Sequence, residues 1–327
     1  MLPAPDQSLM KAVLGTPGPA QRRAVAKAIT LLESTRADHR ARADALLNAL
    51  LPHAGRALRL GISGVPGVGK STFIEALGLF LIERGHRVAV LAVDPSSSVS
   101  GGSILGDKTR MERLSMDTRA FIRPSPASGT LGGVAEKTRE AMLVCEAAGH
   151  DVVIVETVGV GQSETAVAGM TDLFVLMQLP NAGDDLQAIK KGVMELADLV
   201  LINKADLDAD AATRAQAQIT SALRLIGTHA HAAAQVMQLS ALKATGLAEF
   251  WAAVINFRDA TNAAGQLAER RHRQDQAWMW ERIEAGLRAQ FRQHPAVRAA
   301  LPQITNEVHA GRLAASVAAR RLLDLMH

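Results

Sequence analysis

The chain has 327 residues, of which 48% are hydrophobic and 21% charged, and its formal net charge is +4. This composition is typical of a globular protein with a sizeable core, and no apolar run approaches the ~20 residues that a membrane span needs. The first residues lack the apolar core of a signal peptide, and the one cysteine, Cys145, excludes an internal disulfide. We therefore expect a cytoplasmic protein that has no contact with a membrane.

Hydrophobic spacing predicts three parts, at residues 1–56, 57–260 and 261–327. The first is helical, with apolar residues at helical intervals in 20–35 and 41–51. The last is also helical, with Pro295 and Pro302 as predicted breaks. In the middle part, helices alternate with apolar strands at 58–63, 87–94, 120–123, 152–156, 173–179, 199–203 and 236–240. This alternation predicts an α/β fold with a doubly wound, mostly parallel sheet.

A glycine-rich segment follows the first predicted strand and precedes a predicted helix. It matches the phosphate-loop pattern G-x-x-x-x-G-K-[ST] without mismatch. With the first residue of the helix, its members are Gly64, Val65, Pro66, Gly67, Val68, Gly69, Lys70, Ser71 and Thr72. In this context the backbone N–H groups are expected to surround phosphate oxygens. Lys70 should reach the β- and γ-phosphates, and the Ser71 hydroxyl should ligate Mg²⁺.

A second motif, N-K-x-D, comes directly after a later predicted strand and consists of Asn203, Lys204, Ala205 and Asp206. The Asp206 carboxylate can accept from both N1–H and the exocyclic amino group of guanine, donors that adenine lacks at that edge. Asn203 is expected to tie this loop to the phosphate loop, while the Lys204 stem covers the base. The alternative is that Asp206 only caps the next helix.

A third guanine-contacting loop is predicted at the end of the last strand, where the sequence reads Ser240, Ala241 and Leu242. There the Ala241 N–H would meet the guanine O6. Together the three segments predict GTP and GDP, with Mg²⁺, as the ligands of this chain.

Three acidic residues lie at or beyond strand ends, where ligands bind in open parallel sheets. Asp94 ends the second predicted strand, Glu156 ends the fourth, and Asp107 lies in a loop between them. Carboxylate oxygens near the β- and γ-phosphates can hold Mg²⁺, directly or through water. The alternative for each is an ordinary polar residue at a strand end or in a surface loop.

These motifs resemble those of the MeaB/ArgK family of P-loop GTPases over nearly the whole chain. The matching segments are G-V-P-G-V-G-K-S, V-D-P-S-S, G-D-K-T-R-M, E-T-V-G-V-G-Q-S-E and N-K-A-D. The resemblance implies a SIMIBI-type G domain, similar to the nickel-insertion and signal-recognition GTPases, with N- and C-terminal helical extensions. It further implies a chaperone that gates adenosylcobalamin delivery to methylmalonyl-CoA mutase and protects that enzyme. It also implies a homodimer held by the C-terminal arm.

The resemblance assigns roles to individual residues. It places Lys70 and Ser71 at phosphate and Mg²⁺, and Asp94, Asp107 and Glu156 in the metal surroundings and switches. Segment 180–191 is implied to be an additional switch that reports to the mutase, and its polar positions are Asp184, Gln187 and Lys190.

Two departures from other GTPases bear on the mechanism. In Ras-like GTPases a glutamine follows the glycine of the second switch and orients the attacking water. Val160 takes that place here and Gln162 comes two residues later, so intrinsic hydrolysis should be slow. Related deviant phosphate loops have a lysine where this chain has Val65. Lys190 is therefore the candidate cation for the transition state, the alternative being a solvated lysine at a helix start.

Other functions require residues that are not found together in this sequence. A nickel-inserting GTPase needs a thiolate or histidine cluster, whereas the chain has one cysteine, and His229 and His231 have no partner nearby in sequence. A transport-linked kinase needs an acceptor groove and a general base, and neither is identified. The open alternatives are a nucleotide-binding scaffold without significant turnover, or a GTPase serving another cobalamin-dependent acyl-CoA mutase or a metallocentre.

The C-terminal part has apolar stripes in predicted helices at 266–292 and 306–326. Their members are Trp278, Ile283, Leu287 and Phe291, then Val308, Leu313, Val317, Leu322 and Leu325. Such stripes must be buried, either on the chain's own GTPase domain or against a two-fold partner. The arginines of this region are spaced along the helices and no tyrosine accompanies them, which favours a protein interface over nucleic acid.

Overall fold

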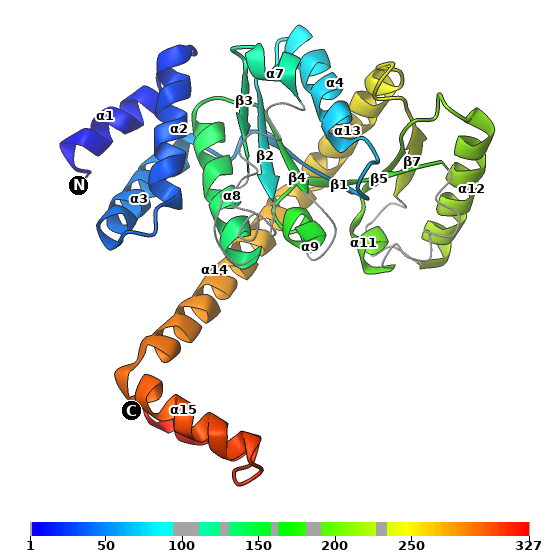
Figure 1. The fold of residues 1–327 in the computed structure, drawn as a ribbon. Coiled ribbons are helices and arrows are strands. Elements are labelled where there is room, and N and C mark those ends of the chain that lie inside the picture. Colours follow the sequence, from blue (N-terminus) through cyan, green and yellow to red (C-terminus); the bar gives the residue numbers. More distant parts are fainter. Residues whose placement is uncertain are drawn as a thin grey trace. The chain divides into compact units, whose positions relative to one another are not determined.

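The computed structural model describes residues 2–93, 111–124, 131–157, 163–180, 191–226 and 234–326. The chain separates into two compact units, residues 1–267 and 268–327. The first contains the sheet and both sets of helices that cover it, and the second is helical (Figure 1). The N-terminal helices belong to the first unit.

A seven-stranded sheet forms the centre of the first unit, and every described pairing in it is parallel. The strands are β1 (Leu58–Gly64), β2 (Val88–Val93), β3 (Ala120–Arg123), β4 (Val152–Thr157), β5 (Leu173–Gln178), β6 (Leu199–Ile202) and β7 (Gln235–Gln238). Their order is β3-β2-β4-β1-β5-β6-β7. The chain thus builds outward from β1 on one side, returns through β4, and continues on the other side from β5. The predicted α/β fold is confirmed, and all carboxyl ends of the strands lie at one edge.

Helices cover both faces of the sheet, which explains why the strands are apolar without alternation. One face packs against α8 (Leu131–Ala147), α9 (Ser163–Ala168), α11 (Lys191–Leu196) and α12 (Ala209–Ile226), and α2 (Pro19–Glu33) and α3 (Ala37–Leu50) pack on α8 as a further layer. The other packs against α4 (Lys70–Glu83), α7 (Glu112–Met116) and α13 (Leu247–Ala263). On that second face, Phe73 of α4 and Phe250 of α13 meet edge to face, with ring centroids 5.2 Å apart. Both side chains are completely buried, and the contact joins the helix that begins at the phosphate loop to α13.

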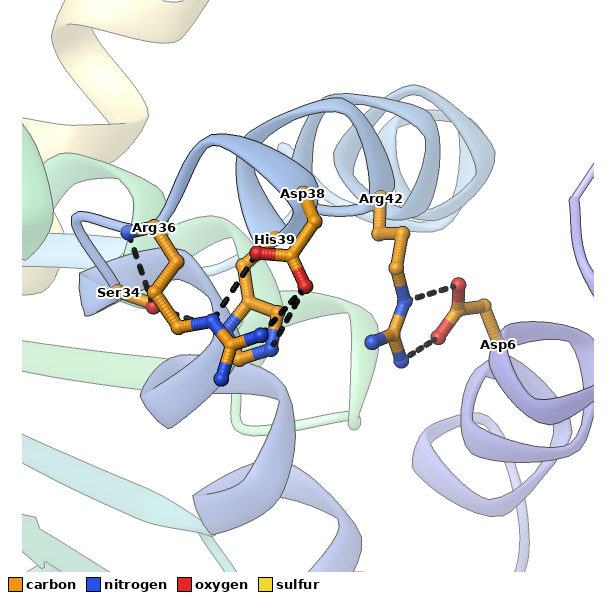
Figure 2. Close-up of polar contacts among 6 residues, drawn as sticks. All are labelled: Asp6, Ser34, Arg36, Asp38, His39 and Arg42. Atoms are coloured by element: carbon orange, nitrogen blue, oxygen red, sulfur yellow. Dashed lines mark hydrogen bonds and ion pairs between the residues drawn. The ribbon is translucent and has the colours of Figure 1, made fainter.

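The N-terminal extension contains a helix, α1 (Ala4–Val13), before the two segments whose apolar spacing was noted in the sequence. It is held by the carboxylate of Asp6, which is buried and accepts two hydrogen bonds of 3.0 and 2.8 Å from the Arg42 guanidinium on α3 (Figure 2). The Arg42 contact holds the pKa of Asp6 below its usual range. Farther along, the amide of Gln21 on α2 donates to the carbonyl of Ala148, so the extension is also bonded to the sheet unit. Helix α1 also packs on α2 and α3, where Val13 is buried and Leu9 and Met10 lie against the core.

A buried ion pair lies at the end of the sheet where the strands begin. Arg59 of β1 donates to Glu146 of α8 at 2.6 and 3.2 Å, and the Gly55 N–H donates to the same carboxylate. Both charged side chains are almost completely buried, at 9% and 1% exposure. Burial of two charges costs free energy that only good geometry and full hydrogen bonding offset. This pair meets that condition and joins β1 to the helix layer.

The second unit corrects one sequence prediction. Its helices are the greater part of α14 (Gln266–Gln293), then α15 (Pro295–His309) and α16 (Ala315–Asp324). Pro295 starts α15 as expected, but Pro302 lies inside that helix and does not break it. Proline removes the bond to the carbonyl of Arg298, and because both positions are exposed, water can satisfy that carbonyl. The helix instead ends at His309, and Gly311 two residues later has a φ of 67°, which suits a left-handed cap.

We predict that Glu146→Leu lowers the free energy of unfolding by about 3–5 kcal/mol, because it leaves the Arg59 guanidinium buried without a counter-charge. Urea denaturation would measure the loss. The matched control is Arg36→Ala, which breaks an ion pair to Asp38 whose side chains are 68% and 59% exposed, and which should leave the urea midpoint unchanged. A loss below about 1 kcal/mol in Glu146→Leu would contradict the prediction.

Candidate functional site

The phosphate loop lies between the end of β1 at Gly64 and the start of α4 at Lys70. Its shape requires glycine at two crowded positions. Gly64 has a φ of 152°, and a Cβ there would lie 2.5 Å from the carbonyl oxygen of Met177. Gly69 has a φ of 95°, and its Cβ would lie 2.7 Å from Nδ2 of Asn203. The glycines of the motif therefore allow the loop to pass close to β5 and to the loop after β6.

The Lys70 side chain turns back over its own loop. Its Nζ donates to the carbonyl oxygen of Gly64 at 2.6 Å and contacts that of Val65 at 3.4 Å. The ammonium therefore lies beside the loop at the beginning of α4, where the first backbone N–H groups of the helix also gather. Positive charge and helix N-terminus together favour an anion at this point.

Asn203 joins three loops at the carboxyl edge of the sheet. Its Nδ2 donates to the carbonyl oxygen of Val68 in the phosphate loop at 2.8 Å. Its Oδ1 accepts from the Ala241 N–H in the loop after β7 at 2.9 Å. The predicted bond between Asn203 and the phosphate loop is therefore present. The side chain is buried, so both bonds are protected from water and each partner would be costly to leave unpaired.

Lys204 also connects the N-K-x-D loop to the phosphate loop, through an exposed hydrogen bond. Its Nζ donates to the carbonyl oxygen of Gly67 at 2.9 Å, and its backbone is left-handed, with a φ of 61°. This conformation is uncommon for a residue other than glycine and persists only when surrounding contacts enforce it. The lysine stem thus spans from the N-K-x-D loop to the phosphate loop, and its predicted role in covering a base stays a prediction.

The Asp206 carboxylate is mostly buried and held by the loop after β7. The Ser240 hydroxyl donates to it, and this bond, with further help from Lys243, holds the pKa of Asp206 below its usual range. The two loops also share a backbone bond, from the Ala205 N–H to the carbonyl of Leu239 at 3.2 Å. Asp206 is consequently an ionised acceptor of fixed orientation at this edge of the sheet.

One contact differs from the simplest expectation for base binding. The Ala241 N–H, predicted to meet the guanine O6, donates to Asn203 here, so a base carbonyl would share or replace that bond. Beside it, the Leu242 side chain is 82% exposed, and Leu207, which follows Asp206, is 76% exposed. These two leucines place exposed apolar side chains beside Asp206, one on the N-K-x-D loop and one on the loop after β7.

Glu156 and Ser71 are the described residues whose oxygen atoms could hold a metal ion. Glu156 lies near the end of β4, is buried, and pairs in register with Ile62 of β1, two residues before the phosphate loop. Ser71 is in the first turn of α4. One carboxylate and one hydroxyl fit Mg²⁺, which keeps several waters and takes its other ligands from substrate phosphates. Within the described ranges no group of three or more His, Cys, Asp or Glu side chains forms a metal site.

A hydroxyl pair lies next to this position and was not anticipated from the sequence. The side chains of Ser63 and Thr157 are both buried, and their oxygens are 2.9 Å apart. Ser63 precedes the phosphate loop and Thr157 ends β4, so the pair fixes the strand that bears Glu156 against β1. The signal in the sequence was a polar residue at the end of each of two neighbouring apolar strands.

Several sequence-predicted residues lie outside the described ranges. They are Asp94, Asp107, Val160, Gln162, Asp184, Gln187, Lys190, His229 and His231. Their predicted roles therefore stay predictions. The described site brings together the phosphate loop, N-K-x-D, the Ser-Ala-Leu loop and Glu156.

Comparison with known proteins agrees with this geometry. Residues 25–296 match the family model described as methylmalonyl Co-A mutase-associated GTPase MeaB. The chain is 55% identical over 304 residues to a protein of Caulobacter vibrioides whose name assigns it provisionally to the GTPases, covering 92% of this chain and 93% of that one. It is 47% identical over 315 residues to the methylmalonic aciduria type A homolog, mitochondrial, of Mus musculus, covering 93% and 76%.

A solved structure is similar over the full length. The crystal structure of a LAO/AO transport system kinase, for which no organism is named, has a TM-score of 0.77 and 36% identity, and covers 100% of this chain and 99% of that one. None of the described helices combines the length and apolar character needed to cross a membrane. The matched family model and the extent of these similarities show that the chain belongs to the MeaB family of P-loop GTPases.

Proposed function

We propose that this protein binds GTP and GDP with Mg²⁺, hydrolyses GTP, and acts in the cytoplasm as a chaperone of adenosylcobalamin-dependent methylmalonyl-CoA mutase. The observation that carries the nucleotide part is the ionised Asp206 carboxylate, oriented by Ser240 and linked through Asn203 to the phosphate loop. Family membership and the name of the mouse relative support the mutase part. No nucleic acid or membrane is among the proposed partners.

Base preference follows from the chemistry of the carboxylate. Guanine offers two donors to the two oxygens of Asp206, whereas adenine offers none at that edge. A carboxylate facing adenine would lose its solvation without gaining a hydrogen-bond donor, so adenine nucleotides should bind much more weakly than guanine nucleotides. Around the phosphates, residues 64–72 supply backbone N–H groups and the Lys70 ammonium. Ser71, Asp94, Asp107 and Glu156 are the proposed Mg²⁺ surroundings.

The first prediction tests base selection. Wild-type protein should bind GDP at least about 100-fold more tightly than ADP, because only guanine pairs with Asp206. Asp206→Asn should reduce this preference and favour xanthine nucleotides, whose base presents an acceptor to the new amide. Isothermal titration calorimetry with GDP, ADP and XDP measures all three. Equal binding of GDP and ADP by the wild type would refute the proposed nucleotide specificity.

Hydrolysis is proposed to be slow in the isolated protein and faster with the partner. Val160 occupies the place where Ras-like enzymes have a water-orienting glutamine, so the attacking water lacks that side chain. Lys70, Asp94 and Glu156 are the proposed groups around the reacting phosphate. Segment 180–191 is the proposed switch to the mutase, with Asp184, Gln187 and Lys190 as its polar contacts and Lys190 as the cation for the transition state.

The second prediction concerns this activation. Methylmalonyl-CoA mutase should raise the GTP hydrolysis rate, and Lys190→Ala should lose the increase while keeping nucleotide binding, because the missing cation acts on the transition state. Phosphate release with and without the mutase measures the rate, with Lys27→Ala as a control for the loss of one lysine. Undetectable turnover in both conditions would instead indicate a nucleotide-binding scaffold, and activation by a different acyl-CoA mutase would reassign the partner.

We further propose that residues 261–327 form a dimerisation arm. Support comes from α14, where Trp280, Ile283 and Leu287 repeat at helical intervals and are 55%, 41% and 57% exposed. Exposed apolar stripes of this kind are normally covered by a partner, and two-fold symmetry is the commonest arrangement.

The third prediction is that the full chain is a dimer and that removal of residues 264–327 gives a monomer. GTP binding should be kept, because every nucleotide motif lies upstream. Light scattering at micromolar concentration measures the mass. The double variant Trp280→Ser/Leu287→Ser offers a check in the intact chain and should also be monomeric. A monomeric mass for the wild type would exclude the arm as a dimer interface.

A further inference from the structure

Lys243 contacts the carboxylate that is proposed to read the base. Its Nζ lies 3.5 Å from Oδ2 of Asp206. The lysine side chain is 61% exposed, whereas that of Asp206 is 12% exposed. The lysine side chain is therefore largely in solvent, while the carboxylate offers only a small accessible edge. A cation at that edge occupies an oxygen that a bound base would also need.

The loop that bears Lys243 is closed and well defined. Ser240 and Thr245 exchange two backbone hydrogen bonds, each 3.1 Å long. Within this loop the Lys243 N–H donates to Oγ of Ser240 at 3.2 Å. Because Oγ accepts there, its hydroxyl proton is available for Asp206. Lys243 is thus linked to Asp206 in two ways. Its backbone N–H bonds to Ser240, which is a partner of Asp206, and its ammonium contacts the carboxylate directly. A side-chain substitution removes only the second contact.

Guanine and hypoxanthine place different demands on this carboxylate. Guanine presents N1–H and an exocyclic amino group, one donor for each oxygen. Hypoxanthine lacks the amino group and leaves one oxygen without a donor. A nearby ammonium can pair with that oxygen when hypoxanthine is bound, but the amino group of guanine must displace it. The same lysine therefore stabilises a bound hypoxanthine nucleotide and competes with a guanine nucleotide for the carboxylate.

We propose that Lys243 is a specificity-determining residue whose ammonium pairs with Asp206 when no exocyclic amino group does so and is displaced when guanine binds. This inference rests on the proposed guanine-nucleotide binding. Its consequence is that Lys243 reduces discrimination between guanine and hypoxanthine nucleotides. An ion pair with one exposed partner is weak, so the effect is expected to be about threefold rather than orders of magnitude.

The experiment compares the dissociation constants of GDP and IDP for full-length wild type, Lys243→Met, Lys243→Arg and Lys11→Met. Methionine keeps the length of the stem and the backbone N–H but removes the charge. Arginine keeps the charge, and Lys11→Met on α1 makes the same change in net charge on an element that does not contribute to the site. Calorimetry or displacement of a fluorescent guanine nucleotide gives both constants.

In Lys243→Met we expect GDP to bind about threefold more tightly and IDP to bind equally or more weakly, so that the preference for GDP increases. Lys243→Arg and Lys11→Met should keep the wild-type ratio. The difference between wild type and Lys243→Met should shrink between about 50 and about 500 mM NaCl, since the screening length falls from about 14 to about 4 Å. In an Asp206→Asn background Lys243→Met should not change the ratio, because the pair is already broken.

An unchanged ratio in Lys243→Met, or equal weakening of both nucleotides, would overturn the inference. These outcomes differ from failure of the proposed function. If wild-type protein does not prefer GDP to ADP, the guanine proposal itself fails. If it does prefer GDP and Lys243→Met behaves as wild type, only the role of Lys243 is lost.

Discussion

The buried side-chain amide of Asn203 is the contact on which the arrangement of the site depends. It bonds to Val68 in the phosphate loop and to Ala241 after β7, residues 135 and 38 positions away in the chain. Loops are ordinarily the least constrained parts of a fold. Here one amide, shielded from water, bonds to both sides and, with the Lys204–Gly67 and Ala205–Leu239 bonds, sets the distance between the loop that can bind phosphate and the loops that can bind a base. The position of Asp206 relative to Lys70 follows from that distance.

The parallel sheet provides the frame for this contact. Because all described strands run in the same direction, the loops after β1, β6 and β7 meet at one edge, and the end of β4 lies beside them. Close approach then requires glycine at Gly64 and Gly69, where a Cβ would meet β5 or Asn203 itself. Near the start of β1 the Arg59–Glu146 pair joins the sheet to α8, and within the N-terminal extension the Arg42–Asp6 contact joins α3 to α1. Polar contacts thus determine geometry at both ends of an apolar core.

Lysines of the site make different kinds of contact. Lys70 lies over its own loop, Lys204 spans between two loops, and Lys243 contacts the carboxylate of Asp206. Each ammonium lies next to oxygen atoms of the protein. Binding of a nucleotide would exchange some of these contacts for contacts with the ligand, so affinity reflects a difference between two sets of bonds and not the ligand contacts alone.

The sequence alone determined the chemistry of the site and the class of the fold. The phosphate loop, N-K-x-D and Ser-Ala-Leu segments are local patterns whose backbone requirements are contained within a few residues, and continuous apolar strands indicated a sheet covered on both faces. Only the tertiary structure decided which side chains meet. The bond from Asn203 to the phosphate loop was predicted from the motif. The second bond of Asn203, to Ala241, the Ser63–Thr157 pair and the Asp206–Lys243 contact each join segments whose proximity depends on strand order and register. The bounds of α1 and the passage of α15 through Pro302 were missed for a related reason. Helix α1 packs on α2 and α3 and bonds to Arg42, and the carbonyl of Arg298 is open to water, and neither condition can be recognised before the chain has folded.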